Sequence, residues 1–144
     1  MFIGEYLHSI DEKGRLAIPY RIRKFLRGGA VVCRGIIDKC LFLYPKEEWE
    51  KLAGKLSQLP LSDPRARAFT RLIFSGAVEV SFDRQGRILL PAFLRQYAGI
   101  KNQVVISGVY NRVEIWDEKA WQLYKKEMEG KRQEIAKRLG ELGV

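Results

Sequence analysis

The sequence predicts an α+β protein in which two ββαββ units, related by a pseudo-twofold axis, intertwine into one β-barrel-like core flanked by amphipathic helices. Three observations predict this fold. The chain repeats at a spacing of 72 residues, each copy combines short strand patterns with one short helical pattern, and a longer helical pattern follows each copy. Each β unit has only about 45 residues, fewer than a single core usually needs, so we expect the two copies to pack together and the helices to lean against them.

The repeat is clearest around two similar turns. Residues 9–19 align with residues 81–91, and five of these eleven positions are identical, namely Ser, Asp, Gly, Arg and Pro. Four further positions are apolar in both copies, and the last two are polar in both. The same register continues to Trp49 and Trp121. The sequence therefore contains two copies of one structural unit.

Each copy begins with two predicted strands joined by a tight turn. Asp11 and Asp83 suit the first position of such a turn, because aspartate accepts hydrogen bonds from the backbone two residues on. Gly14 and Gly86, three residues later, supply the positive φ of a hairpin with a bulge. The alternation of apolar and polar residues predicts strands at residues 5–10, 15–18, 77–82 and 87–90.

A short helix and a second hairpin complete each unit. Pro19 and Pro91 mark where the helix begins, because the first helical position needs no backbone N–H. Gly28 and Gly99 mark where we expect each helix to end. The second hairpins are predicted at residues 30–35 with 39–44 and at residues 103–108 with 112–116.

Amphipathic helices follow each unit. Trp49 to Leu56 form an apolar stripe, Asp63 suits the start of a second helix, and Asp117 suits the start of a longer helix interrupted near Gly130. The predicted organisation is a first β unit at 5–47, a helical connector at 48–75, a second β unit at 76–119, and a C-terminal helix and tail at 120–144.

Charge and composition narrow the function. The chain has 26 lysines and arginines against 17 aspartates and glutamates, a formal net charge of +9. This excess favours a polyanion as the partner. The longest near-continuous apolar stretch, residues 88–94, is short and contains a proline, so we expect no membrane span. The N-terminal residues do not resemble a signal peptide, and we expect a cytoplasmic protein.

The residue types needed for common catalytic or metal sites are scarce. Cys33 and Cys40 are the only cysteines and form no CxxC motif, so they are interpreted as core residues rather than zinc ligands or a redox pair. His8 is the only histidine, so no HExxH motif is possible. We therefore expect no enzymatic activity, no cofactor, no metal and no small-molecule substrate.

Two arginines are the main functional candidates. Arg15 and Arg87 directly follow the turn glycine in each copy, although a hairpin turn does not need an arginine there. Their recurrence suggests a function on one shared surface. The alternative is that each arginine pairs with its own turn aspartate, Asp11 or Asp83, and only stabilises the turn.

The first copy carries a basic segment around this arginine. Residues 13–27 contain no acidic residue, and their basic residues are Lys13, Arg15, Arg21, Arg23, Lys24 and Arg27. A turn and a neighbouring helix could together form a cationic ridge suited to phosphate contacts and to arginine–guanine readout. The second copy is less basic, because Gln85 and Gln96 replace two of the lysines.

The segment Asp11-Glu-Lys-Gly-Arg15-Leu-Ala-Ile-Pro19 resembles the SpoVT/AbrB-like swapped-hairpin domains of bacterial transcription factors. With the second copy, Trp49, and the Glu-Ile-Trp-Asp segment at 114–117, the resemblance extends from Met1 to about Met128. It implies a regulator, of repressor type, that binds short direct repeats of double-stranded DNA upstream of the division and cell wall gene cluster. It also implies a ring-shaped homo-oligomer located in the cytoplasm on the nucleoid.

The resemblance also implies which residues contact DNA. They are the arginines of the Asp-x-x-x-Arg motifs, Arg15 and Arg87, and the basic residues after the Ile-Pro step, Arg23 and Lys24, to which we add Lys13. Two other functions stay open. One is a protein-interaction module of the antitoxin type with only generic polyanion binding, and the other is an enzyme acting on nucleic acid.

Overall fold

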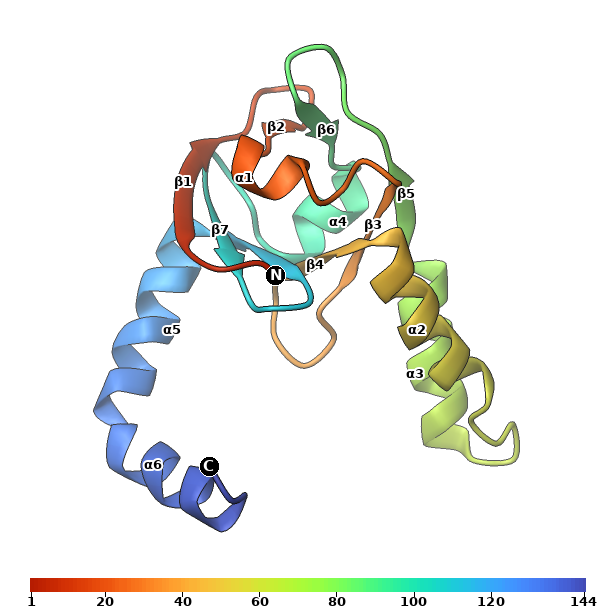
Figure 1. Ribbon diagram of the computed structural model, residues 1–144, viewed down its shortest axis with the longest axis vertical. Coiled ribbons are helices and arrows are strands. Elements are labelled where there is room, and N and C mark those ends of the chain that lie inside the picture. Colours follow the sequence, from red (N-terminus) through yellow and green to blue (C-terminus); the bar gives the residue numbers. More distant parts are fainter.

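The computed structural model describes residues 1–144 and shows an α+β protein, as predicted. Figure 1 shows a β-body from which two helical arms extend. The strands are β1 (Glu5–Ser9), β2 (Arg15–Ala17), β3 (Ala30–Arg34), β4 (Leu41–Pro45), β5 (Val78–Val80), β6 (Arg87–Leu89), β7 (Gln103–Gly108) and β8 (Val113–Asp117). The helices are α1 (Tyr20–Arg23), α2 (Lys46–Ser57), α3 (Pro64–Ser75), α4 (Ala92–Tyr97), α5 (Glu118–Gly130) and α6 (Arg132–Glu141).

The strand order shows the internal repeat directly. A six-stranded antiparallel sheet has the order β1-β7-β8-β4-β3-β5, and β2 and β6 form a separate two-stranded ribbon. A shift of 72 residues converts each strand into its counterpart and leaves this order unchanged when read backwards. The pseudo-twofold axis therefore passes between β4 and β8 in the sheet, and between Leu16 and Ile88 in the ribbon.

The two copies are intertwined, as the size of each unit predicts. β1 pairs with β7 of the second copy, and β5 pairs with β3 of the first. The turns form as expected, because Gly14 and Gly86 have positive φ angles of 86° and 74°. The strands on either side of the first turn then separate after a single bridge between Ile10 and Leu16. Each strand instead finds its longer ladder in the other copy.

The core lies between the sheet, the β2–β6 ribbon and the two short helices. It contains eighteen buried apolar residues. Most of them occur as repeat pairs that are almost completely shielded from solvent, including Leu16/Ile88, Ile22/Leu94, Val32/Val104 and Leu43/Ile115. Full burial of one such side chain contributes roughly 1.5–3 kcal/mol. Both copies thus contribute nearly equal numbers of residues to the core, which explains how two small units share one stable body.

The first short helix ends earlier than predicted. α1 stops at Arg23, and the chain continues in tight turns in which the N–H groups of Phe25 and Leu26 donate to carbonyls three residues back. These turns bring Leu26 into the core, where it is 1% exposed, so the expectation that Gly28 ends the helix is wrong. In the second copy the expectation holds, because α4 ends at Tyr97 and Gly99 follows with a positive φ.

Helices α3 and α5 begin where the sequence predicts. The Asp63 carboxylate accepts hydrogen bonds from the N–H groups of Arg65 and Ala66 at the start of α3. The Asp117 carboxylate accepts one from Ala120 at the start of α5. No helix in the structure combines the length and apolar character needed to cross a membrane.

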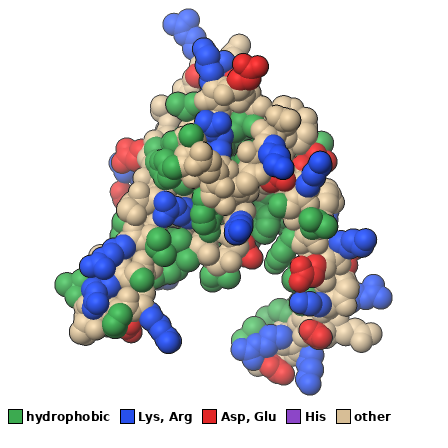
Figure 2. All heavy atoms as spheres, turned by 180° about the vertical axis from the view of Figure 1, so that it is seen from behind, with side chains coloured by type: hydrophobic (Ala, Val, Ile, Leu, Met, Phe, Trp, Pro, Cys, Tyr) green, Lys and Arg blue, Asp and Glu red, His purple; other side chains and the backbone are tan.

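The arms extend away from the β-body, although we expected the helices to lean against it (Figure 1). Aromatic contacts fix them where they meet the sheet, with Trp49 packing on Tyr44 and Trp121 packing on Trp116. Beyond these contacts several apolar side chains of the arms are exposed, namely Leu61, Leu72, Leu123, Ile135 and Leu139. Figure 2 shows such hydrophobic side chains among the basic ones on both arms.

Candidate nucleic-acid interface

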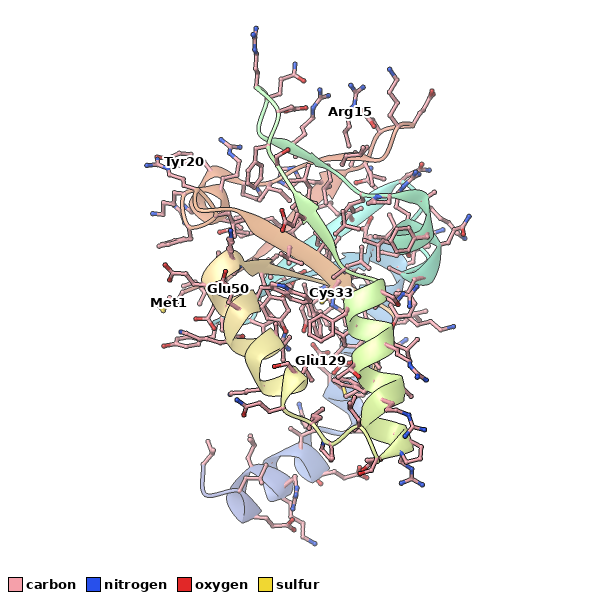
Figure 3. All side chains as sticks on the ribbon, turned by 90° about the vertical axis from the view of Figure 1, so that its right-hand side faces the viewer. Met1, Arg15, Tyr20, Cys33, Glu50 and Glu129 are labelled. Atoms are coloured by element: carbon pink, nitrogen blue, oxygen red, sulfur yellow. The ribbon has the colours of Figure 1, made fainter.

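The two Asp-x-x-Gly-Arg turns lie together at the end of the β-body that is farthest from the arms. Figure 3 shows Arg15 at this end, Tyr20 to one side of the same end, and Cys33 in the middle of the molecule. The space-filling view in Figure 2 shows lysine and arginine side chains around the same end. The predicted cationic surface therefore lies at this end of the molecule.

The aspartate of each turn organises the backbone around it. Asp11 Oδ1 accepts hydrogen bonds from the N–H groups of Lys13 (3.0 Å) and Arg15 (2.9 Å). Asp83 Oδ1 accepts equivalent bonds from Gln85 (2.8 Å) and Arg87 (3.0 Å). These backbone N–H groups, above all those of the two arginines, hold the pKa of each carboxyl group below its ordinary value. Both aspartates are therefore ionised at neutral pH.

The turn arginines pair with these aspartates, as the stabilising alternative predicted. Arg15 Nε donates to Asp11 Oδ2 at 2.6 Å, and Arg87 Nε donates to Asp83 Oδ2 at 2.8 Å. Each hydrogen bond uses only Nε, and no hydrogen bond of the structure occupies the Nη groups of either arginine. Because one edge of each guanidinium is held, its other edge is positioned to donate to a ligand.

The strand register places both arginines on one outer surface. Leu16 and Ile88 face each other across the β2–β6 ribbon and are completely buried, so their neighbours Arg15 and Arg87 point to the opposite, outer face. Their side chains are 37% and 27% exposed. Arg87 Nη1 also lies 3.9 Å from Asp11 Oδ2, which brings the two turns into contact at the pseudo-twofold axis.

Two further arginines hold the turns from below. Arg23 Nη1 donates to the carbonyl of Ile18 at 2.8 Å, and Arg95 Nε donates to the carbonyl of Leu90 at 2.9 Å. Arg23 was predicted as a DNA contact from its position after the Ile-Pro step. Its position shows that it also supports the fold, and its repeat counterpart Arg95 does the same.

The turn glycines are required by these arginines as well as by their backbone angles. A Cβ atom on Gly14 would lie 2.6 Å from the carbonyl oxygen of Leu90 and 2.9 Å from Arg95 Nε. A Cβ atom on Gly86 would collide with the guanidinium of Arg23. Each supporting arginine thus packs under the turn of the other copy.

The exchange of strands changes which helix stands beside which turn. We expected the basic helix α1 to join the turn of its own copy, but it lies beside the second turn. The groove between them is lined by Tyr20, Arg23, Lys24, Arg27, Phe82, Asp83, Arg84 and Gly86. The matching groove beside α4 is lined by Ile10, Asp11, Glu12, Lys13, Arg15, Arg95, Lys101 and Asn102.

One basic residue of this surface, Arg84, was not predicted from the sequence. Arg84 is exposed at the second turn, where it joins the basic residues of α1. Its repeat counterpart is Glu12, so the alignment of the two copies shows no shared basic residue there. Lys13 and Lys24, which were predicted, are also exposed.

The cysteines lie away from this surface. Cys33 and Cys40 are both free and buried. Burial raises the pKa of the Cys33 thiol to about 12 and that of Cys40 further, so neither forms a reactive thiolate at neutral pH. What the turn surface offers chemically is a row of hydrogen-bond donors and positive charges, the groups that contact phosphates and the acceptor edges of guanine.

Comparisons with known proteins agree on one family. The family model described as "MraZ protein, putative antitoxin-like" matches residues 1–72 and 73–141. The chain is 50% identical over 142 residues, 99% of both chains, to the transcriptional regulator MraZ of Thermomicrobium roseum. It is 47% identical to the protein of that name from Halothermothrix orenii and 49% identical to one from Desulfitobacterium hafniense, in each case over 144 residues and 100% of both chains.

Proposed function

The chain belongs to the MraZ family, and from this premise we propose that it is a sequence-specific DNA-binding transcriptional regulator that represses the genes it binds. Its targets are short direct repeats upstream of the division and cell wall gene cluster. The observation that carries this proposal is the pair Arg15 and Arg87, held on one outer surface with Nη groups that make no hydrogen bond within the protein.

The shape of the surface supports contact with the major groove. That groove admits a two-stranded β-ribbon, and the β2–β6 ribbon presents Arg15 and Arg87 on its outer face. In the proposed complex these two arginines donate to guanine O6 and N7. Lys13, Lys24 and Arg84 contact phosphates around them, while Arg23 adds positive charge and keeps the second turn in place.

Assembly into a ring would explain the arms. We propose that residues 5–47 and 76–119 act as one DNA-binding body, and that the arms in 48–75 and 120–144 bury their exposed apolar side chains between copies of the chain. Several protomers in one ring could bind several repeats at once and gain avidity. The proposed regulator works in the cytoplasm on the nucleoid, and binding alone accounts for its action without a catalytic step or a cofactor.

A DNA titration of the wild type and the Arg15→Ala variant tests this proposal. It uses a tandem-repeat promoter fragment and a scrambled duplex at two salt concentrations. We expect Arg15→Ala to lose roughly 1–3 kcal/mol of specific binding, as for an arginine that contacts a base. Arg138→Ala is the matched control, because Arg138 also pairs with a carboxylate (2.9 Å to Glu141) but lies on α6 in an arm.

Each outcome has a clear meaning. Tight binding to the repeats alone, lost in Arg15→Ala and kept in Arg138→Ala, supports both the function and the site. An unchanged curve for Arg15→Ala contradicts the site. Equal, salt-sensitive binding of the wild type to both duplexes would favour the antitoxin-type interaction module instead, with the exposed apolar arms as its binding surface.

A further inference from the structure

The two sides of the β2–β6 ribbon differ in charge, although the repeat relates them by symmetry. We define the α1 side as residues 20–29 with the turn at 83–87, and the α4 side as residues 92–101 with the turn at 11–15. The α1 side has six basic residues and one carboxylate, whereas the α4 side has four basic residues and two carboxylates. The pseudo-twofold symmetry of the fold is therefore not a symmetry of its electrostatic surface.

Three of the six basic residues of the α1 side contact aromatic rings. Arg27 Nη2 donates to the hydroxyl of Tyr20 at 3.4 Å, and the Arg23 guanidinium lies 5.7 Å from the centre of the same ring. Lys24 Nζ lies 5.1 Å from the ring centre of Phe25. Such contacts limit the motion of long side chains before a ligand arrives. At the positions equivalent to Tyr20, Lys24 and Arg27, the α4 side has Ala92, Gln96 and Gly99.

Most of the basic residues of the α1 side have no carboxylate partner within the protein. None of the ion pairs in the structure involves Arg21, Lys24, Arg27 or Arg84. The one carboxylate on this side, that of Asp83, is already paired with Arg87. An exposed cation without a partner can neutralise a DNA phosphate, and this releases counterions condensed on the DNA and favours the complex.

The additional carboxylate of the α4 side, that of Glu12, lies in the first turn. Glu12 occupies the position of Arg84, so one turn presents a negative group where the other presents a positive one. A carboxylate at the tip of a turn repels an approaching phosphate. Lys13 and Lys101 add positive charge on this side, but they share the groove with Asp11 and Glu12.

We propose that the α1 side is the principal site for the phosphodiester backbone of DNA, formed by Lys24, Arg27 and Arg84 around Tyr20, and that the α4 side contributes much less. This inference rests on the proposed DNA-binding function and adds a defined orientation of the protomer on the DNA. A protomer that holds the backbone mainly on one side of its reading arginines has a defined orientation along the duplex. Successive protomers that face the same way match direct repeats rather than a palindrome.

A matched pair of double variants tests this inference. Lys24→Gln with Arg84→Glu places the α4-side residue types on the α1 side. Lys13→Gln with Lys101→Glu makes the same change in formal charge on the α4 side. All four side chains are exposed and form no ion pair, so neither variant is expected to unfold. Binding of each to the tandem-repeat duplex is measured over a fourfold range of salt concentration.

The α1-side variant is expected to bind about tenfold more weakly. Its plot of log K against log salt should be less steep by about two, one unit for each phosphate contact removed. The α4-side variant is expected to change affinity by less than about threefold and to make the slope less steep by no more than about one, because Lys13 is its only proposed phosphate contact. Equal losses in the two variants, or a larger loss in the α4-side variant, would overturn the inference. A wild type that does not bind the repeats would contradict the proposed function itself.

Discussion

The interior and the surface of the two repeat copies have diverged to different degrees. Inside the molecule, Leu16 and Ile88 fill equivalent places in the core, and Arg23 and Arg95 support the turns in the same way. On the surface, equivalent positions carry different groups, as in the exchange of Lys24 for Gln96 and of Arg84 for Glu12. Because each copy packs on the other, the fold constrains both interiors equally, whereas it leaves the surfaces free to differ.

The strongest test of this equality is the removal of a core side chain on the pseudo-twofold axis. Leu16→Ala and Ile88→Ala each remove a completely buried side chain, and each should lower the free energy of unfolding by about 2–5 kcal/mol. Since the two residues face each other in the ribbon, the two losses should be similar. Urea unfolding measures both. A difference of more than about 2 kcal/mol would show that the two copies do not share the core equally.

Substitution of the turn glycines should destabilise the two copies to different extents. Gly14→Ala is expected to cost about 2–3 kcal/mol, because the left-handed backbone is strained and the new Cβ meets the backbone carbonyl of Leu90. Gly86→Ala has the same strain, but its Cβ meets the end of the Arg23 side chain, which can move. We expect a smaller cost of about 1–2 kcal/mol there.

Thermal or urea unfolding of the two glycine variants gives the ranking. A larger loss for Gly86→Ala would mean that Arg23 cannot be displaced from beneath the second turn. That result would identify Arg23 as a rigid structural residue and would remove it from the proposed DNA contacts.

Arg23 and Arg95, the two arginines that support the turns, should contribute similarly to stability. Arg23→Ala and Arg95→Ala each remove a half-buried hydrogen bond to a backbone carbonyl, which should cost about 1 kcal/mol of unfolding free energy in either copy. Their effects on DNA affinity should differ, because Arg23 belongs to the α1 side and Arg95 to the α4 side. DNA titration after a stability measurement separates the two roles. Equal losses of affinity would weaken the distinction between the two sides.

Local patterns in the sequence were sufficient to predict most of the secondary structure. The turns at Asp11 and Asp83, the prolines before the short helices and the capping residue Asp63 each act through their immediate neighbours. The helix end at Gly28 was wrong, because the need to bury Leu26 overrode a local signal. Interactions between near neighbours can be predicted from spacing, and demands of the core cannot.

The site was predicted in part for the same reason. Arg15 and Arg87 were found because they repeat, but the placement of α1 beside the second turn depends on which strands pair across the copies. That exchange also brings Arg84 to the basic residues of α1, although Arg84 lies far from them in sequence. The outward direction of the arms likewise depends on the tertiary structure rather than on the apolar stripe of each helix.

Acidification should have the smallest effect on the free energy of unfolding, and this effect should differ between the two turns. The pKa of Asp11 and that of Asp83 lie below the ordinary value of an aspartate, mainly because backbone N–H groups of Arg15 and Arg87 donate to the ionised carboxylates. Groups with lowered pKa values stabilise the fold above their ordinary pKa, and this stabilisation is lost as the pH falls through the value in the folded state. Unfolding free energy should therefore be insensitive to these two groups at neutral pH and should fall in strongly acidic solution.

Asp11→Asn and Asp83→Asn, measured by urea unfolding from about pH 6 to about pH 2, assign this loss to each turn. Each variant should lose less stability on acidification than the wild type, because an amide has no carboxylate to protonate. The difference should be larger for Asp11, since its carboxylate lies near Arg87 of the second turn (3.9 Å) as well as Arg15. A larger effect at Asp83 would indicate that the contact between the turns adds nothing, and that each turn is stabilised only by its own arginine.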